Sequence, residues 1–85
     1  MNQRYLVIIV VGPDRPGLIS EITSVIADFE HNIEEMDQVV MKGIFVLTLL
    51  VNIKDTGSLE SLRKKLSYRC NELGLEVTFY YAGAK

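Results

Sequence analysis

The chain has 85 residues, of which 48% are hydrophobic and 24% are charged, and its formal net charge is -2. A chain of this length forms one domain, and so small a domain buries only about 60% of the surface that its unfolded chain exposes. The composition excludes a disordered or low-complexity chain. We therefore expect a single folded domain over residues 1–85, which a partner subunit would stabilise further.

Charge and cysteine content exclude further classes. Nine basic and eleven acidic residues include one basic cluster, residues 63–65, which falls in a helical pattern, so nucleic-acid binding is not expected. The single cysteine, Cys70, excludes an internal disulfide and a cysteine-based metal cluster, and it fits a reducing cytoplasm. No stretch approaches the roughly 20 apolar residues of a membrane span. We expect a cytoplasmic protein with no membrane segment and no cofactor.

The chain begins with a strand and a helix. Residues 5–11, "YLVIIVV", are continuously apolar and rich in β-branched side chains, which is typical of an inner strand. Apolar residues then recur at the spacing of one helical face, with polar residues between them. The members of this face are Leu18, Ile19, Ile22, Val25, Ile26 and Phe29.

A hairpin follows. Residues 33–41 mix apolar and acidic side chains, which predicts an edge strand whose charges discourage indiscriminate pairing. Lys42 and Gly43 form a tight turn, and residues 44–53, "IFVLTLLVNI", return as a second inner strand.

The chain ends with a second helix and a strand. Ser58 is expected to cap a helix whose apolar stripe stops at Gly74. Residues 75–81 alternate apolar and polar side chains, which predicts a strand with one buried face. The stripe of this second helix consists of Leu59, Leu62, Leu66, Cys70 and Leu73.

The order βαββαβ predicts an α+β fold. Two right-handed βαβ units of similar length, each with room for a strand of the other, give a ferredoxin-like sandwich. Its four-stranded antiparallel sheet carries both helices on one face. The other sheet face and edge strand 33–41 stay uncovered and partly apolar, which favours a homodimer or a higher homo-oligomer.

This fold supports unrelated functions, so function must come from a site. RNA-recognition modules need stacking aromatics on the middle strands, which here offer only Tyr5 and Phe45. Copper chaperones need a CxxC pair in the first loop, which is absent. An acylphosphatase-like hydrolase that holds phosphate with Arg15 and Asn32 remains an alternative, although that family's glycine-rich loop is missing.

One motif points to a family. Residues 14–18, "DRPGL", precede the first helix, and Asn32 and Ile33 begin the second strand. This arrangement resembles the ACT domain, a small amino-acid-sensing module of metabolic enzymes and regulators. The resemblance covers residues 5–81 and is greatest to stand-alone ACT proteins and to the ACT segments of phosphoserine phosphatase, formyltetrahydrofolate deformylase and the glycine cleavage repressor.

The resemblance implies a non-catalytic regulatory module that binds an amino acid at the interface of a homodimer. That dimer would be built side by side through strand 33–41 and the first helix, and it would act on itself or on a metabolic enzyme or regulator in trans. A module of the same fold that has lost the ligand and serves only in protein interaction or oligomerisation is the alternative in the binding class.

The chemistry of the first loop fits such a ligand. Pro16 is expected in the first helical turn, and Asp14 is expected to cap the helix by accepting from the Gly17 N–H. The helix N-terminus suits a carboxylate, while the Asp14 charge suits an ammonium group. The expected ligand-binding residues, by resemblance, are Gly12, Asp14, Arg15, Pro16, Gly17, Leu18, Ile19 and Asn32.

A purely structural interpretation stays open at several of these positions. Asp14 can be only a cap, Asn32 can close a turn in a left-handed conformation, and Arg15 can face solvent or an acidic neighbour. His31 is expected to favour the dipole at the end of the first helix rather than bind a metal, and Cys70 to be a small core residue. No nucleophile and base pair is recognisable, so we expect neither a catalytic nor a metal site.

Overall fold

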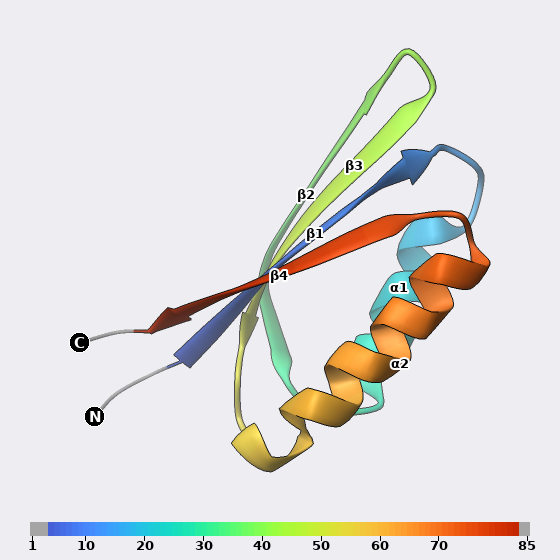
Figure 1. The fold of residues 1–85 in the computed structure, drawn as a ribbon. Coiled ribbons are helices and arrows are strands. Elements are labelled where there is room, and N and C mark those ends of the chain that lie inside the picture. The colour runs from blue at the N-terminus through green and yellow to red at the C-terminus, as the bar shows by residue number, and fades with distance from the viewer. Residues whose placement is uncertain (1–3, 84–85) are drawn as a thin grey trace.

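The computed structural model describes residues 4–83 and has one antiparallel sheet with the strand order β2-β3-β1-β4. Both helices cover the same face of this twisted sheet (Figure 1). The predicted α+β sandwich, with its βαββαβ order, is confirmed. The elements are β1 (Arg4–Pro13), α1 (Leu18–Ala27), β2 (Asn32–Met41), β3 (Ile44–Asn52), the short 3-10 helix η1 (Thr56–Ser58), α2 (Leu59–Glu72) and β4 (Glu76–Gly83).

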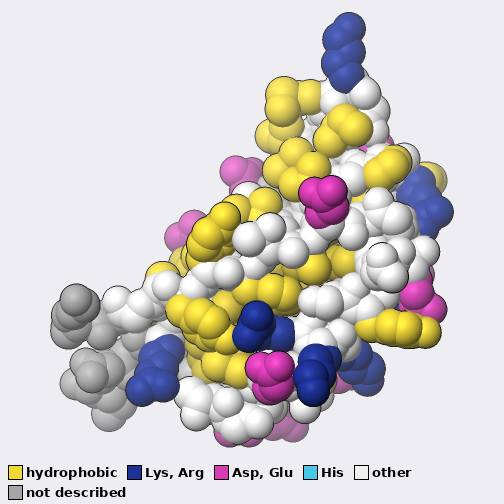
Figure 2. Space-filling model, viewed as in Figure 1, with side chains coloured by type: hydrophobic (Ala, Val, Ile, Leu, Met, Phe, Trp, Pro, Cys, Tyr) yellow, Lys and Arg dark blue, Asp and Glu magenta, His cyan; other side chains and the backbone are white. Residues whose placement is uncertain are grey.

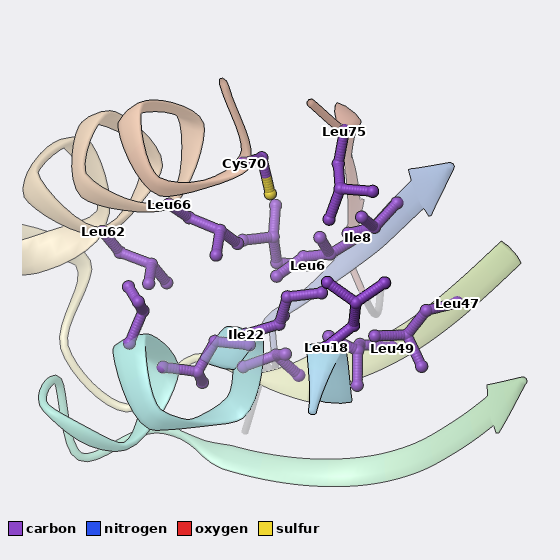
Figure 3. Packing of buried hydrophobic residues seen from close by; sticks show 14 of the residues in the cluster. Leu6, Ile8, Leu18, Ile22, Leu47, Leu49, Leu62, Leu66, Cys70 and Leu75 are labelled. Atoms are coloured by element: carbon purple, nitrogen blue, oxygen red, sulfur yellow. The ribbon is translucent and has the colours of Figure 1, made fainter. Parts of the chain in front are cut away.

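The core lies between the sheet and the helices. Alternate residues of the inner strands β1 and β3 are completely or almost completely buried, as a strand with one face on a core requires. They meet one face of α1 and one of α2 (Figure 3). The strands contribute Leu6, Ile8, Val10, Phe45, Leu47, Leu49 and Val51, and the helices contribute Leu18, Ile22, Val25, Ile26, Leu62, Leu66 and Cys70.

The helix ends differ from the prediction in two places. α1 stops at Ala27, so Phe29 lies beyond it, and Glu30 adopts a left-handed φ of 59° before β2 begins. Ser58 is the N-cap residue of α2, as predicted, but its side chain does not cap the helix, because the hydroxyl donates to the Asp55 carbonyl instead, at 3.1 Å. The Asp55 side chain caps η1 by accepting from the Gly57 N–H at 3.0 Å.

Cys70 is a core residue, as predicted, and this burial has a measurable consequence. Desolvation raises the pKa of its thiol to about 11 from the model-peptide value of 9.0. Because the unfolded chain ionises its thiol at lower pH than the folded one, this contribution to stability is complete below pH 9 and is lost as the pH rises towards 11. The expected loss at pH 10 is about 1.4 kcal/mol.

Chemical denaturation of the wild type and of Cys70→Ala between pH 8 and pH 10.5 measures this loss. The free energy of unfolding should fall more steeply with pH in the wild type than in the alanine variant. The variant is the control because it keeps every other group that titrates at alkaline pH. Equal slopes would contradict a buried, protonated thiol.

The strands at the two edges of the sheet are exposed. β2 is exposed along its whole length and carries a β-bulge between Ile33 and Glu35. Figure 2 shows hydrophobic side chains gathered over the β2–β3 hairpin at the top of the view. Near the tip of this hairpin, the exposed hydrophobic residues are Val39, Val40, Met41 and Ile44, which are 43–61% exposed. Within residues 4–83, no helix is long and apolar enough to cross a membrane.

Candidate functional site

The loop between β1 and α1 lies beside the β2–β3 hairpin turn and the turn that leads from α2 into β4. Gly12 still belongs to β1 and pairs with Phe45 of β3, and a Cβ at Gly12 would collide with the Leu75 side chain. The backbone N–H of Asp14 donates to the carbonyl of Gly43 in the hairpin turn, at 2.9 Å. Close packing against Leu75 therefore accounts for Gly12, which does not line the hollow at this loop.

The predicted cap is wrong in its details. The N-cap of α1 is Gly17, whose φ of 86° is left-handed and suits glycine, and no side chain caps the helix. Pro16 precedes the N-cap instead of lying in the first helical turn. The Asp14 carboxylate has no partner among the described residues, so it is free to bind something else.

Arg15 makes a hydrogen bond to the backbone that the amino-acid sequence did not predict. Its Nη2 donates to the carbonyl of Leu73, at 3.4 Å, just beyond the end of α2. This bond ties the loop to the second helix, although Arg15 also borders the hollow described next. Arg15 is exposed to solvent, as expected, and the long bond to Leu73 adds a contact to the backbone rather than to an acidic neighbour.

A shallow hollow of about 390 Å³ lies between this loop, the start of α1 and the strands β2 and β3. The N–H groups of the first helical turn, residues 18–20, have no acceptor within the helix, as at every helix start. The unpaired Asp14 carboxylate borders the same hollow, so donors and a negative charge lie together. The hollow is lined by Asp14, Arg15, Pro16, Gly17, Leu18, Ile19, Ser20, Gln38 and Phe45.

Three of these residues were not expected from the sequence. Ser20 follows Ile19, the last expected residue of the first helical turn, so extending the predicted site by one residue along the helix would have included it. Gln38 and Phe45 come from β2 and β3, and only the strand register places them at this end of the sheet. Gln38 is a polar residue among apolar ones on the helix side of β2, which is the signal that the sequence offered.

Asn32 lies at the other end of α1, away from the loop within one chain. It begins β2 opposite Asn52, whereas the loop lies beside Met41 and Ile44, at the far end of the same strand pair. Asn32 borders a second hollow of about 640 Å³ between α1 and β2. The second hollow is lined by Ser20, Thr23, Ser24, Ile26, Ala27, His31, Asn32, Ile33 and Glu34.

Ser20 borders both hollows, so the two adjoin along the exposed side of α1 and the helix side of β2, and we treat them together. We call this pair of hollows the α1–β2 groove. Arg15 and Asn32 lie at its opposite ends, separated by a helix of ten residues that is about 15 Å long. One chain therefore does not bring together the arginine and asparagine of an acylphosphatase-like site.

His31 is buried just beyond the end of α1 and makes hydrogen bonds to the connection between β3 and α2, a role that the expected effect on the helix dipole did not include. Its Nδ1 accepts from the Lys54 N–H at 3.0 Å, and its Nε2 lies 3.1 Å from the Ser58 hydroxyl. Since the Ser58 hydroxyl donates to Asp55, the neutral ring satisfies both partners when Nε2 carries the proton. In the described part of the chain, no group of three His, Cys, Asp or Glu side chains could hold a metal ion.

Comparison with known proteins agrees with this architecture. The chain is 38% identical over 72 residues to a UPF0237 protein of Methanopyrus kandleri, covering 84% of this chain and 80% of that one. An ACT domain protein from Streptococcus pneumoniae superimposes with a TM-score of 0.81 at 23% identity, covering 93% of this chain and 90% of that one. A formyltetrahydrofolate deformylase from Pseudomonas putida gives a TM-score of 0.81 at 14% identity, covering 89% of this chain and 28% of that one. With residues 4–80 matching the ACT domain, the chain belongs to the ACT domain family.

Proposed function

We propose that this protein is a non-catalytic regulatory module that binds an amino acid where two copies of the chain meet. The observation that carries the proposal is the unpaired Asp14 carboxylate beside the open N–H groups of the first turn of α1. An amino acid presents a carboxylate and an ammonium group a short distance apart. The helix N-terminus suits the first group, and Asp14 suits the second.

A side-by-side dimer would complete this site. β2 is an edge strand, and its helix side exposes Ile33, Met36 and Val40. If two β2 strands pair antiparallel about a two-fold axis near their middle, Asn32 of one copy comes beside Met41 of the other. Met41 lies at the end of the sheet that carries the loop, since it pairs with Ile44 and Ile44 pairs with Pro13.

This dimer explains why the site residues are split within one chain. Each α1–β2 groove would be covered by the other copy, and the side-chain amide of the second Asn32 would reach the hollow beside Asp14. Ligand would then bind more tightly to the dimer than to the monomer. This difference in affinity would shift the equilibrium towards the dimer, or change how well a metabolic enzyme docks. A cytoplasmic location remains part of this proposal.

Titration calorimetry with the twenty standard amino acids tests the proposal. We expect one amino acid, or a small group of similar ones, to bind, and we expect Asp14→Ala to weaken that binding by about 10-fold or more because it removes a charge-assisted contact. Asp28→Ala is the matched control. Asp28 lies at the other end of α1, where its carboxylate approaches Lys65 at 3.8 Å on the surface.

Two results would count against the proposal. The first is the absence of binding by any amino acid, which would favour the alternative of a ligand-free interaction module. The second is a monomer in light scattering at micromolar concentration, which would rule out a site that needs two copies.

A further inference from the structure

The second edge of the sheet, β4, has an open side. Its inner side pairs with β1 from Arg4 opposite Gly83 to Val11 opposite Glu76. On its outer side, no strand within residues 4–83 pairs with it. An open edge presents a row of backbone N–H and C=O groups that can pair with another chain.

β4 also lacks the features that usually protect an edge. β2 carries a bulge at Ile33 and Glu35 and further acidic side chains, whereas β4 has one charged residue, Glu76, at its very start. The rest of β4, "VTFYYAG", contains no proline, no bulge and no lysine. An edge that is regular and uncharged over seven residues is well suited to accepting an added strand.

A groove with basic side chains runs beside this edge. A hollow of about 550 Å³ separates α2 from β4 and is lined by Glu60, Arg63, Lys64, Ser67, Val77, Thr78 and Phe79. The Arg63 guanidinium lies over the rings of Phe79 and Tyr81, with its carbon 5.5 and 6.0 Å from the ring centroids. These cation–π contacts hold the guanidinium beside the edge strand.

The donors of these basic side chains are only partly used. Arg63 Nη1 lies 3.5 Å from the Glu60 carboxylate, while Arg63 Nε is buried with no acceptor among the described residues. Lys64 makes no ion pair within residues 4–83. Two cations against one anion give the groove a positive charge, and the Arg63 side chain, which is 41% exposed, can donate to an incoming carboxylate.

We propose that β4 and α2 bind an extended segment of another protein that carries carboxylate side chains at every second position. The segment would add a fifth strand along β4, and its alternate side chains would all point to the helix side of the sheet. There they meet Arg63 and Lys64. In the proposed dimer both β4 strands form outer edges, so this surface stays open, and it does not depend on amino-acid binding.

Fluorescence anisotropy with synthetic peptides tests this inference. The probe is a labelled, end-capped heptapeptide of alternating threonine and glutamate. The controls are the same peptide with lysine in place of glutamate, and the glutamate peptide with alternate backbone nitrogens methylated, which prevents strand pairing. We expect saturable binding of the first peptide only, with each control at least ~10-fold weaker.

Protein variants locate the site. Arg63→Gln should weaken binding of the glutamate peptide by about 10-fold, and Arg63→Lys should recover only part of it because lysine lacks the planar fork. Lys42→Gln, which removes a cation at the hairpin tip, should leave binding unchanged. Far-UV circular dichroism checks that each variant is folded. Absence of binding, equal binding of the methylated or the lysine peptide, or equal loss in Lys42→Gln would overturn the inference.

Discussion

Replacing Phe45 by alanine should lower the free energy of unfolding by about 3–5 kcal/mol. Phe45 is the largest fully buried side chain, 1% exposed, and it lies on the helix side of β3. Removing its ring leaves a cavity between β3 and α1, where the rigid sheet limits how far the surroundings can collapse. Urea denaturation followed by far-UV circular dichroism measures the loss.

Val46→Ala is the matched control, because its side chain is only half-buried on the other face of the same strand. It should cost about 1 kcal/mol or less. A similar, small cost for both variants would contradict the placement of Phe45 in the core. Phe45 also lines the hollow beside Asp14, so Phe45→Leu, which keeps more of the volume, is the variant suited to binding measurements.

Replacing His31 by alanine should cost about 2–4 kcal/mol, since it combines a cavity with lost hydrogen bonds. His31 joins the end of α1 to the connection between β3 and α2 through Lys54 and Ser58. Without the ring, the Lys54 N–H loses its acceptor in a partly buried place. Urea denaturation of the wild type and the variant measures the effect.

Two further variants separate the effect of the cavity from the effect of the lost hydrogen bonds. His31→Phe keeps the ring volume and removes both hydrogen bonds, so it should still cost about 1–3 kcal/mol. Ser58→Ala removes the contact with His31 Nε2 and also the hydrogen bond to the Asp55 carbonyl, while the Lys54 contact stays, and it should cost about 1–2 kcal/mol. If His31→Phe were as stable as the wild type, the hydrogen bonds of His31 would contribute nothing, and its role would be packing alone.

The proposed binding residues differ in how far the sequence could place them. Residues 14–19 are consecutive, so their presence around one hollow follows from a loop that leads into a helix. The capping role of Asp14 was wrong because it depends on the φ of Gly17, and a left-handed Gly17 makes glycine itself the N-cap. The absence of this cap supports the proposed binding site, since a carboxylate that caps no helix is available to a ligand.

By itself, the sequence determined the elements and their order. The continuous apolar runs of β1 and β3 and the helical stripes of α1 and α2 are local patterns, and burial of one face follows from them directly. These periodicities also led to the four-stranded sheet with both helices on one face. The "DRPGL" motif located the loop.

Only the tertiary structure decided which distant residues meet. The strand register places Gln38 and Phe45 beside the loop and Asn32 at the opposite end of α1, and no local pattern carries that register. The bonds from Arg15 to Leu73 and from His31 to Lys54 likewise join residues that are 58 and 23 positions apart. Such contacts depend on how whole elements pack, because strand pairing and crossover geometry, rather than neighbouring residues, bring their atoms within hydrogen-bond distance.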